Sequence, residues 1–337
     1  MKSTIVQHRS PSWLHIVGLV LALSPALPAQ AALPVPMALP MPDHVVMVIE
    51  ENRSFSNIIG NASAPFINSL AAQGALMTQS FGIDHASQPN YLQLFSGSNQ
   101  GVTDNSTPHA FNSPNLRSTL ASQGLSFGGY SESLPSIGFT GSSFTTVPGL
   151  SQYQRKHNPW VNWQGAAANA VPAGENLPFS SFPTTAAEFA SLPTVAFVVP
   201  NEQNDMHDGS IAMGDAWLQT RLQGYINWAQ SHNSLLILSF DEDNGSENNH
   251  IATLFVGPMV VPGLYSQTIS HLHVLRTLTD LYGLPAIGDS AGVQAISGIF
   301  VTTPVPEPGA AVLLLGGLPV LWWYRRRTGR SGLTSAT

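Results

Sequence analysis

Three clusters of oxygen-bearing side chains stand out in this sequence of 337 residues. They occupy residues 50–54 (Glu-Glu-Asn-Arg-Ser), 201–208 and 241–244. Carboxylate and amide oxygens are the ligands that hard divalent cations prefer. Three acidic clusters brought together would repel one another unless a cation lay between them. The clusters therefore predict a divalent-metal site.

The same residues also allow a more local interpretation. Acidic residues directly after a strand often form turns or cap helices by bonding to the backbone. For any one cluster, this role explains the residues at least as well as metal binding does. A metal site is the better explanation for all three together.

A fourth segment, residues 85–91 (His-Ala-Ser-Gln-Pro-Asn-Tyr), offers a nucleophile in Ser87. A serine hydroxyl attacks only when a base, a metal or a lowered pKa activates it. Beside a metal ion, its alkoxide becomes accessible at neutral pH without a neighbouring histidine. Without that setting, Ser87 is an ordinary loop serine.

Apolar runs precede the three clusters and predict the strands that position them. The runs, including a fourth, cover residues 44–49, 194–199, 234–239 and 251–256. Such continuous runs are typical of strands buried on both faces. Helical periodicity covers residues 64–73, 214–232 and 273–282. This alternation predicts an α/β fold, a three-layer sandwich with a mostly parallel central sheet, and sheets of this kind bind ligands at the carboxyl ends of their strands.

The composition excludes several classes of function. Only 9% of the residues are charged, and the formal net charge of -7 argues against a nucleic-acid partner. The chain has no cysteine, which excludes disulfides, thiolate catalysis and Cys-ligated zinc. Residues 101–193 are rich in Gly, Ser, Asn and Pro and predict long loops or a small cap over the sheet.

The amino-terminal residues 1–31 are typical of a signal peptide. Lys2 and Arg9 precede an apolar run at residues 13–23, and Ala29-Gln30-Ala31 provides a small-x-small cleavage pattern. The alternative is a membrane anchor, although this run is shorter than the roughly 20 residues that a spanning helix needs. The sequence therefore predicts export.

The carboxyl-terminal residues 304–330 contain a second targeting pattern. A Val-Pro-Glu-Pro motif at 305–308 precedes an apolar stretch at 309–324 and three arginines at 325–327. This order resembles the PEP-CTERM sorting signal of Gram-negative bacteria, and a plain tail anchor is the alternative. The resemblance implies sorting machinery as a partner, a transient membrane segment, and delivery to the periplasm, the outer surface or the exterior.

Four motifs between these two signals resemble the bacterial phosphoesterase family. They lie at residues 50–55, 85–91, 156–160 and 204–209. This family contains acid phosphatases and phospholipases C and belongs to the alkaline-phosphatase superfamily. The resemblance implies an alkaline-phosphatase-like fold over residues 32–303, a small phosphate ester as substrate, and one or two divalent metal ions.

The resemblance also implies roles for individual residues. The implied metal ligands are Glu51, Asn52, Asp241, Glu242, Asp205 and His271. Ser87 corresponds to the nucleophile, and Asn105 to an asparagine that contacts a phosphoryl oxygen. His85, His157 and His207 are candidates for proton transfer, and Lys156 is the candidate cation for the phosphoryl charge, with structural or surface roles as the alternatives.

Two departures from the family pattern bear on the metal. Relatives with two zinc ions have Asp-His where this chain has Asp241-Glu242, and they have an aspartate where this chain has Asn201. Both changes favour a single metal, or an ion harder than zinc, so its identity stays open. The predicted activity is hydrolysis of phosphate monoesters through a phosphoserine. A phosphodiesterase or phospholipase C, and a non-catalytic surface protein, are the alternatives.

Overall fold

A computed structural model describes residues 39–165 and 167–301 of the chain. The predicted signal peptide, residues 1–31, and the predicted sorting segment, residues 304–330, lie outside the described residues. Within the described part, no helix combines the length and the apolar character needed to cross a membrane.

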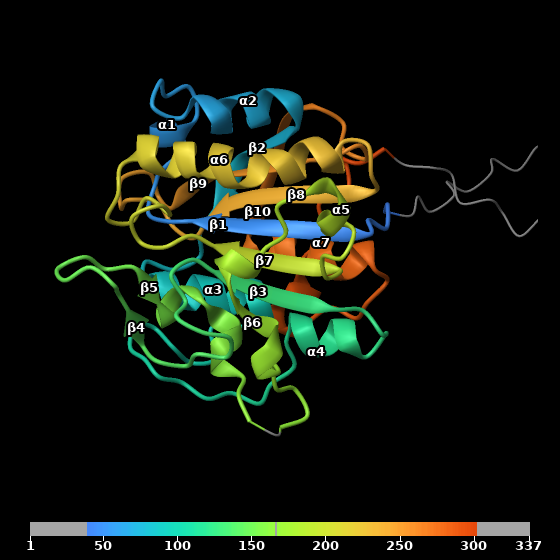
Figure 1. Cartoon of the computed structure of the whole chain (residues 1–337). Helices are drawn as coiled ribbons and strands as arrows, with labels where there is room; N and C mark the ends of the chain where they lie inside the picture. Colours follow the sequence, from blue (N-terminus) through green and yellow to red (C-terminus); the bar gives the residue numbers. More distant parts are fainter. Residues whose placement is uncertain (1–38, 166, 302–337) are drawn as a thin grey trace, which may run out of the picture. The chain divides into compact units, whose positions relative to one another are not determined.

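An eight-stranded sheet forms the centre of the described chain, in the order β10-β2-β9-β8-β1-β7-β3-β6 (Figure 1). Its strands are β1 (His44–Glu50), β2 (Ala75–Phe81), β3 (Phe127–Ser131), β6 (Asn176–Pro178), β7 (Val195–Val199), β8 (Ser234–Phe240), β9 (His250–Val256) and β10 (Gly263–Ser270). Every neighbouring pair is parallel except the two pairs that involve β9. The prediction of a mostly parallel sheet is confirmed.

Helices cover both faces of this sheet and create two separate apolar cores. Along β1, Val45 and Met47 face one core while Val46 and Val48 face the other. The first core lies under α3 (Ser87–Ser96), α4 (Leu116–Ala121) and α7 (His271–Leu281). The second lies under α1 (Phe55–Ile58), α2 (Pro65–Gln73), α5 (Ala186–Phe189) and α6 (Ile211–Ala229). The predicted three-layer sandwich is therefore confirmed.

Strand β9 runs against its neighbours, although its apolar run, residues 251–256, resembles those of the parallel strands. Burial on both faces produces the same apolar pattern whichever way a strand points. The link from Phe240 to His250 is too short for the crossover that a parallel neighbour would need. The chain therefore turns back beside β8.

The expectation of loops or a cap for residues 101–193 was wrong in part, because β3 and β6 join the main sheet. The rest of this segment contains a small hairpin of β4 (Ser143–Phe144) and β5 (Tyr153–Gln154), followed by η1 (Arg155–His157), η2 (Pro159–Asn162), η3 (Ala173–Glu175) and η4 (Phe179–Ser181). Strand β3 escapes pattern recognition because it contains Gly129. A Cβ there would lie 2.2 Å from Cε2 of Trp160, so glycine lets the indole ring pack directly on the strand.

Candidate active site

The carboxyl ends of β8, β1 and β7 lie side by side and bring the three acidic clusters together. Glu50 pairs in register with Phe240, so Glu51 and Asp241 leave the sheet next to each other. The Asp241 amide donates to the Glu50 carbonyl at 3.0 Å, and the Glu51 amide donates to the Asp205 carbonyl at 2.7 Å. Backbone pairing therefore fixes the relative positions of these three carboxylates.

A tight turn after β1 sets the direction of the next two side chains. Asn52 has a φ of +51°, a left-handed conformation that asparagine tolerates better than most residues. Its backbone amide donates to Asp241 Oδ1 at 3.1 Å. Arg53 Nη2 donates to the Met206 and Gly209 carbonyls at 2.6 and 3.0 Å. These bonds join the turn to the loops after β8 and β7.

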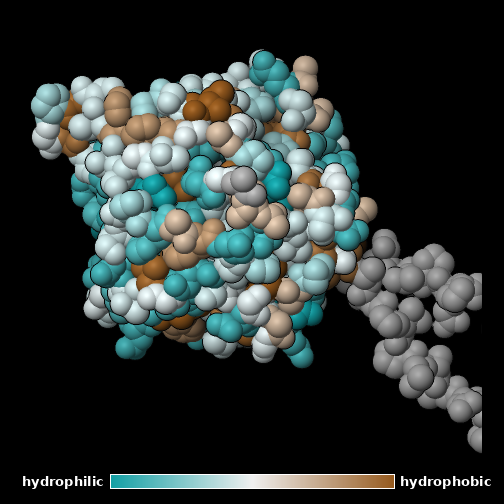
Figure 2. All heavy atoms as spheres, turned by 90° about the horizontal axis from the view of Figure 1, so that it is seen from below, coloured by the Kyte–Doolittle hydropathy of each residue, from teal (hydrophilic) through white to brown (hydrophobic). Residues whose placement is uncertain are grey.

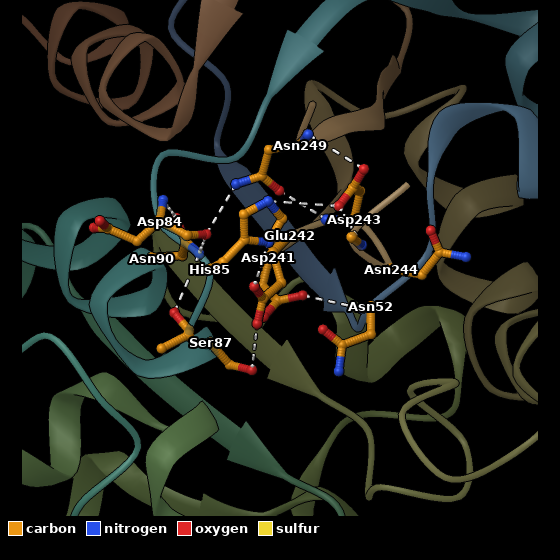
Figure 3. Close-up of polar contacts among 12 residues, drawn as sticks. Asn52, Asp84, His85, Ser87, Asn90, Asp241, Glu242, Asp243, Asn244 and Asn249 are labelled. Carbon is orange, nitrogen blue, oxygen red and sulfur yellow. Dashed lines mark hydrogen bonds and ion pairs between the residues drawn. The ribbon is translucent and has the colours of Figure 1, made fainter. Parts of the chain in front are cut away.

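Ser87 is buried and begins helix α3, which follows β2 and a short loop. Its Oγ lies 3.2 Å from Glu51 Oε2 and 3.0 Å from Glu242 Oε1. A hydroxyl has one proton, so it donates to only one of these carboxylates at a time. Figure 3 shows Ser87 facing Glu242, with Asp241 and Asn52 beside them. The amino end of a helix also favours negative charge on an oxygen at this position.

Tyr91 holds Glu51 from the other side, and the sequence reasoning assigned it no role. Its hydroxyl donates to Glu51 Oε1 at 2.6 Å. Burial, followed by the nearby charge of Glu51, raises the pKa of Tyr91 well above its usual value, so the phenol remains a donor. Tyr91 lies four residues after Ser87, one helical turn away on the same face. Recognising α3 from the sequence would have revealed this relation.

His157 lies between two carboxylates without forming a satisfied pair. Its Nε2 is 3.2 Å from Glu51 Oε1, and its Nδ1 is 3.5 Å from Asp205 Oδ2. Burial, followed by the charges of Lys156 and His207, lowers the pKa of His157 well below its usual value, so we take the ring to be neutral. Among the described residues, His157 Nε2, Asp205 Oδ2 and Asp241 Oδ2 find no hydrogen-bond partner.

Three buried carboxyl groups share this space, and each disfavours ionisation of the others. Burial, followed by the charges of Asp241 and Asp205, raises the pKa of Glu51 well above its usual value. Burial, assisted by Glu202 and Asp241, has the same effect on Asp205. Burial, followed by the charge of Glu242, raises the pKa of Asp241 to about 7. A cation among them would remove both the repulsion and the unsatisfied lone pairs.

The geometry of the cluster fits a divalent metal ion. Glu51, His157 and His207 each offer a ligand atom, and these atoms lie within 4.8 Å of one another. The two contacts of the Ser87 hydroxyl, 3.0 and 3.2 Å, are close to the ~3 Å that separates neighbouring ligands in an octahedral site with bonds of ~2.1 Å. With the unpaired oxygens of Asp205 and Asp241, the cluster offers both carboxylate oxygen and imidazole nitrogen, which leaves the identity of the ion open.

A cationic side chain borders the cluster on the β7 side. Lys156 Nζ lies 3.3 Å from Glu202 Oε1 and 3.4 Å from His207 Nε2. His207 Nδ1 in turn lies 2.8 Å from Asp208 Oδ1. The sequence reasoning assigned no role to Glu202, although its place after β7 is the same signal that singled out Asp205.

His85 lies at the exposed rim of the site. Its side chain is 52% exposed, and Nδ1 is 3.2 Å from Glu242 Oε2. Burial raises the pKa of Glu242, while hydrogen bonds from Ser87 and His85 lower it. Glu242 therefore connects the serine hydroxyl to a histidine that solvent reaches.

Two other predicted residues contact the site through the backbone. The backbone amide of Gln88 donates to Asn105 Oδ1 at 2.9 Å. This bond holds Asn105 at the amino end of α3, beside Ser87. His271 Nε2 lies 2.6 Å from the Asp241 carbonyl oxygen. His271 therefore orients Asp241 through its backbone, and its Nδ1 has no partner among the described residues.

Some members of the acidic clusters do form turns, as the local interpretation anticipated. Asp243 accepts from the amides of Gly245 and Glu247 at 2.6 Å each. Asn201 accepts from the amides of Gln203 and Asn204 at 3.1 and 3.2 Å. The clusters thus divide into residues that shape the loops and residues that face Ser87.

Comparison with known proteins places the chain in a family. The model of the Phosphoesterase family matches residues 61–285. A phosphatidylinositol-3-phosphatase of Mycobacterium tuberculosis is 49% identical over 290 residues, covering 86% of this chain and 89% of that protein. An acid phosphatase of Aspergillus fumigatus is 31% identical over 227 residues, covering 65% of this chain and 51% of that protein. The chain thus spans about half the length of this fungal relative.

Solved structures support the fold. A protein of the alkaline phosphatase superfamily from Vibrio parahaemolyticus superposes with a TM-score of 0.54 at 10% identity, covering 77% of this chain and 73% of that one. The predicted alkaline-phosphatase-like fold is confirmed. The chain belongs to the phosphoesterase family, and the predicted class of enzyme, a hydrolase of phosphoric esters, is confirmed with it.

Proposed function

We propose that this protein is a metal-dependent phosphomonoesterase that uses Ser87 as its nucleophile. The observation that carries the proposal is the placement of the Ser87 hydroxyl at 3.2 and 3.0 Å from the carboxylates of Glu51 and Glu242. A buried serine at a helix amino end, surrounded by acceptors, is arranged to lose its proton.

The site would hold a divalent cation through Glu51, Asn52, Asp241 and Glu242, with Asp205 and His157 contributing their unpaired atoms. When bound, such a cation lowers the pKa of a nearby hydroxyl and neutralises charge on phosphoryl oxygens. His271 keeps Asp241 in place through the backbone carbonyl.

The reaction then proceeds in two displacement steps, each assisted by side chains of the protein. The Ser87 proton passes to Glu242 or Glu51, Oγ attacks phosphorus, and the alcohol leaves, which gives a phosphoserine. Water then cleaves the new P–O bond, releases phosphate and restores the hydroxyl. Lys156 and the side-chain amide of Asn105 would bind the equatorial oxygens, where charge accumulates in phosphoryl transfer.

The leaving alcohol needs a proton, and His207 is the better donor of the two histidines beside Lys156. His157 is buried and its pKa is lowered well below the usual range, so its ring is uncharged at neutral pH and is a poor acid. His207 is partly exposed, with Nδ1 2.8 Å from Asp208 Oδ1, so it can exchange a proton with solvent where the buried His157 cannot. His85, at the rim, can return protons from Glu242 to solvent.

The names of the relatives favour monoesters over diesters, since they are a phosphatidylinositol-3-phosphatase and acid phosphatases. The test is hydrolysis of p-nitrophenyl phosphate and bis-p-nitrophenyl phosphate by the purified protein, before and after EDTA treatment and with metals resupplied. We expect the monoester to be preferred and the activity to follow the metal. Preference for the diester would favour the phosphodiesterase alternative, and turnover insensitive to the chelator would contradict the metal site.

Export to the cell surface remains part of the proposal and rests on the sequence of residues 1–31 and 304–330. We expect fractionation of the producing cells to recover the protein outside the cytoplasm, and deletion of residues 304–330 to change its final location. Recovery of the intact chain in the cytoplasm would contradict both assignments.

A further inference from the structure

The hairpin of β4 and β5 carries a feature that the proposed mechanism does not use. Its connection projects from the rest of the described chain at the left of Figure 1. Residues 133–154 contain no charged side chain, which is unusual for a long exposed segment. Strand β5 continues directly into η1, which contains Lys156 and His157. The projection is thus attached to the catalytic region.

The tip of the hairpin is a hydrogen-bonded turn that presents two apolar side chains. The Leu150 amide donates to the Val147 carbonyl at 3.1 Å, and Gly149 has a φ of +83°. Proline at the second position and glycine at the third are the signature of a type II turn. Val147 and Leu150 stand at its two ends, close together, and each is 43% exposed.

Several polar groups of this tip are hydrogen-bonded within the tip itself. The Val147 amide donates to Thr145 Oγ1 at 3.1 Å, and Thr145 Oγ1 lies 2.9 Å from the Val147 carbonyl. Gln152 Oε1 accepts from the amide and the hydroxyl of Thr146 at 2.9 and 3.2 Å. Because these groups already have partners, moving the tip out of water costs less than it would for an open loop.

The hairpin is also anchored firmly beside the site. The ring of Phe139 packs against those of Phe144 and Tyr153, with centroids 6.1 and 5.7 Å apart. The Gln152 carbonyl accepts from the Glu202 amide at 3.1 Å, and Glu202 pairs with Lys156 at 3.3 Å. A surface that captured the tip would therefore lie at a fixed position relative to Ser87.

The chemistry of the tip favours a lipid surface over a protein partner. A stable protein interface buries on the order of 1,000 Å² or more, whereas this projection offers a few apolar side chains. Ile137, 58% exposed, belongs to the same uncharged segment, and Figure 2 shows hydrophobic surface on the projection. Interfacial binding needs only a small apolar insertion. With a net charge of -7, the chain cannot rely on attraction to anionic headgroups, so apolar insertion must supply the affinity.

We propose that the Val147–Leu150 tip inserts into the surface of a lipid bilayer and that the substrates of this site include phosphomonoester headgroups of membrane lipids. The inference rests on the proposed function and specifies its substrate class. Docking through the tip would raise the local concentration of lipid headgroups at Ser87 without changing the chemical step.

The test uses the double variant Val147→Ser/Leu150→Ser, which keeps Pro148 and Gly149 and therefore the turn. Two substrates are compared: soluble p-nitrophenyl phosphate, and phosphatidylcholine vesicles with phosphatidylinositol 3-phosphate as the minor lipid. We expect kcat/KM for the soluble ester to stay within about twofold. Phosphate release from vesicles and co-sedimentation with them should fall at least about tenfold. Both proteins keep the same termini, so the difference reports the tip alone.

Leu264→Ser serves as the matched control, because Leu264 is 75% exposed on β10, at the edge of the sheet opposite β6. We expect it to behave like the wild type on both substrates. Unchanged vesicle turnover in the double variant would overturn the inference. So would an equal loss on both substrates, which would assign the tip to the support of the site. If the wild type failed to hydrolyse the soluble ester, that result would instead count against the proposed function. Co-sedimentation with vesicles would still measure membrane binding by the tip.

Discussion

The hydroxyl of Tyr91 donates to Glu51 Oε1 at 2.6 Å from a buried ring, and the Ser87 hydroxyl lies 3.2 Å from the other oxygen of the same carboxylate. In the proposed metal site, a donor of this kind would fix which oxygen of the carboxylate faces the cation. The proposed nucleophile, Ser87, and the residue that supports Glu51 thus come from one face of α3, a single helical turn apart.

Replacing Tyr91 with Phe tests this support. The variant leaves Glu51 Oε1 without its donor, and loss of such a partner typically weakens metal binding about 10- to 100-fold. We expect activity at limiting metal to fall by a similar factor and to recover largely at saturating metal. Tyr225→Phe is the control, because its buried hydroxyl donates to the Leu235 carbonyl away from the site. Identical metal titrations for Tyr91→Phe and the wild type would contradict the assignment.

At the scale of elements, the predicted site residues converge because of strand direction. Strands β1, β7 and β8 can be predicted from their continuous apolar runs. Their parallel arrangement brings Glu51, Asp205 and Asp241 to one edge of the sheet. Strand β10 was not recognised, because its exposed residues interrupt the apolar pattern. Helix α3 was not predicted, and its Pro89 lies in the first turn, where amides need no partner and proline is tolerated.

Strand β3 offers a prediction about stability at this scale. In Gly129→Ala the added Cβ would lie only 2.2 Å from Cε2 of Trp160, which is too close for two carbon atoms. The indole ring would therefore have to move. Overpacking of this kind costs about 1–3 kcal/mol in free energy of unfolding. Gly174→Ala, where no atom lies within 4 Å of the added carbon, should change stability by less than about 0.5 kcal/mol. Equal denaturation midpoints for the two variants would contradict the packing argument.

For the molecule as a whole, the buried carboxyl groups couple folding to pH. Burial and repulsion raise the pKa of Asp241 from 3.8 to about 7, and those of Glu51 and Asp205 also rise. In the unfolded chain these carboxyls ionise near pH 4. Their contribution to the free energy of unfolding is therefore fully present below that pH, and it is lost as the pH rises through the raised pKa values of the folded state. The buried histidines have the opposite effect on stability, because the pKa of His271 is lowered to about 4 in the folded protein. This effect acts only below about pH 6.5, where histidines of the unfolded chain become protonated.

We therefore expect the Tm of the metal-free protein to fall between about pH 6.5 and about pH 8, where the carboxyls dominate. The gain in Tm from added metal should grow over the same range, because the cation competes with these protons. Asp241→Asn removes one titrating group and should flatten the metal-free profile. Scanning calorimetry with EDTA and with excess metal measures both trends, and a metal-free Tm that rises across this window would contradict them.

The central claim, that Ser87 is the nucleophile, is tested most directly by trapping the phosphoenzyme. The purified protein is mixed with p-nitrophenyl phosphate, quenched in acid and digested, and the peptides are analysed by mass spectrometry. We expect one added phosphoryl group on Ser87. We also expect no adduct in Ser87→Ala, together with a loss of turnover of about a thousandfold or more, while Ser96→Ala on the same helix should remain active. A phosphoryl group found on another serine or on a threonine instead, or undiminished turnover by Ser87→Ala, would contradict the claim.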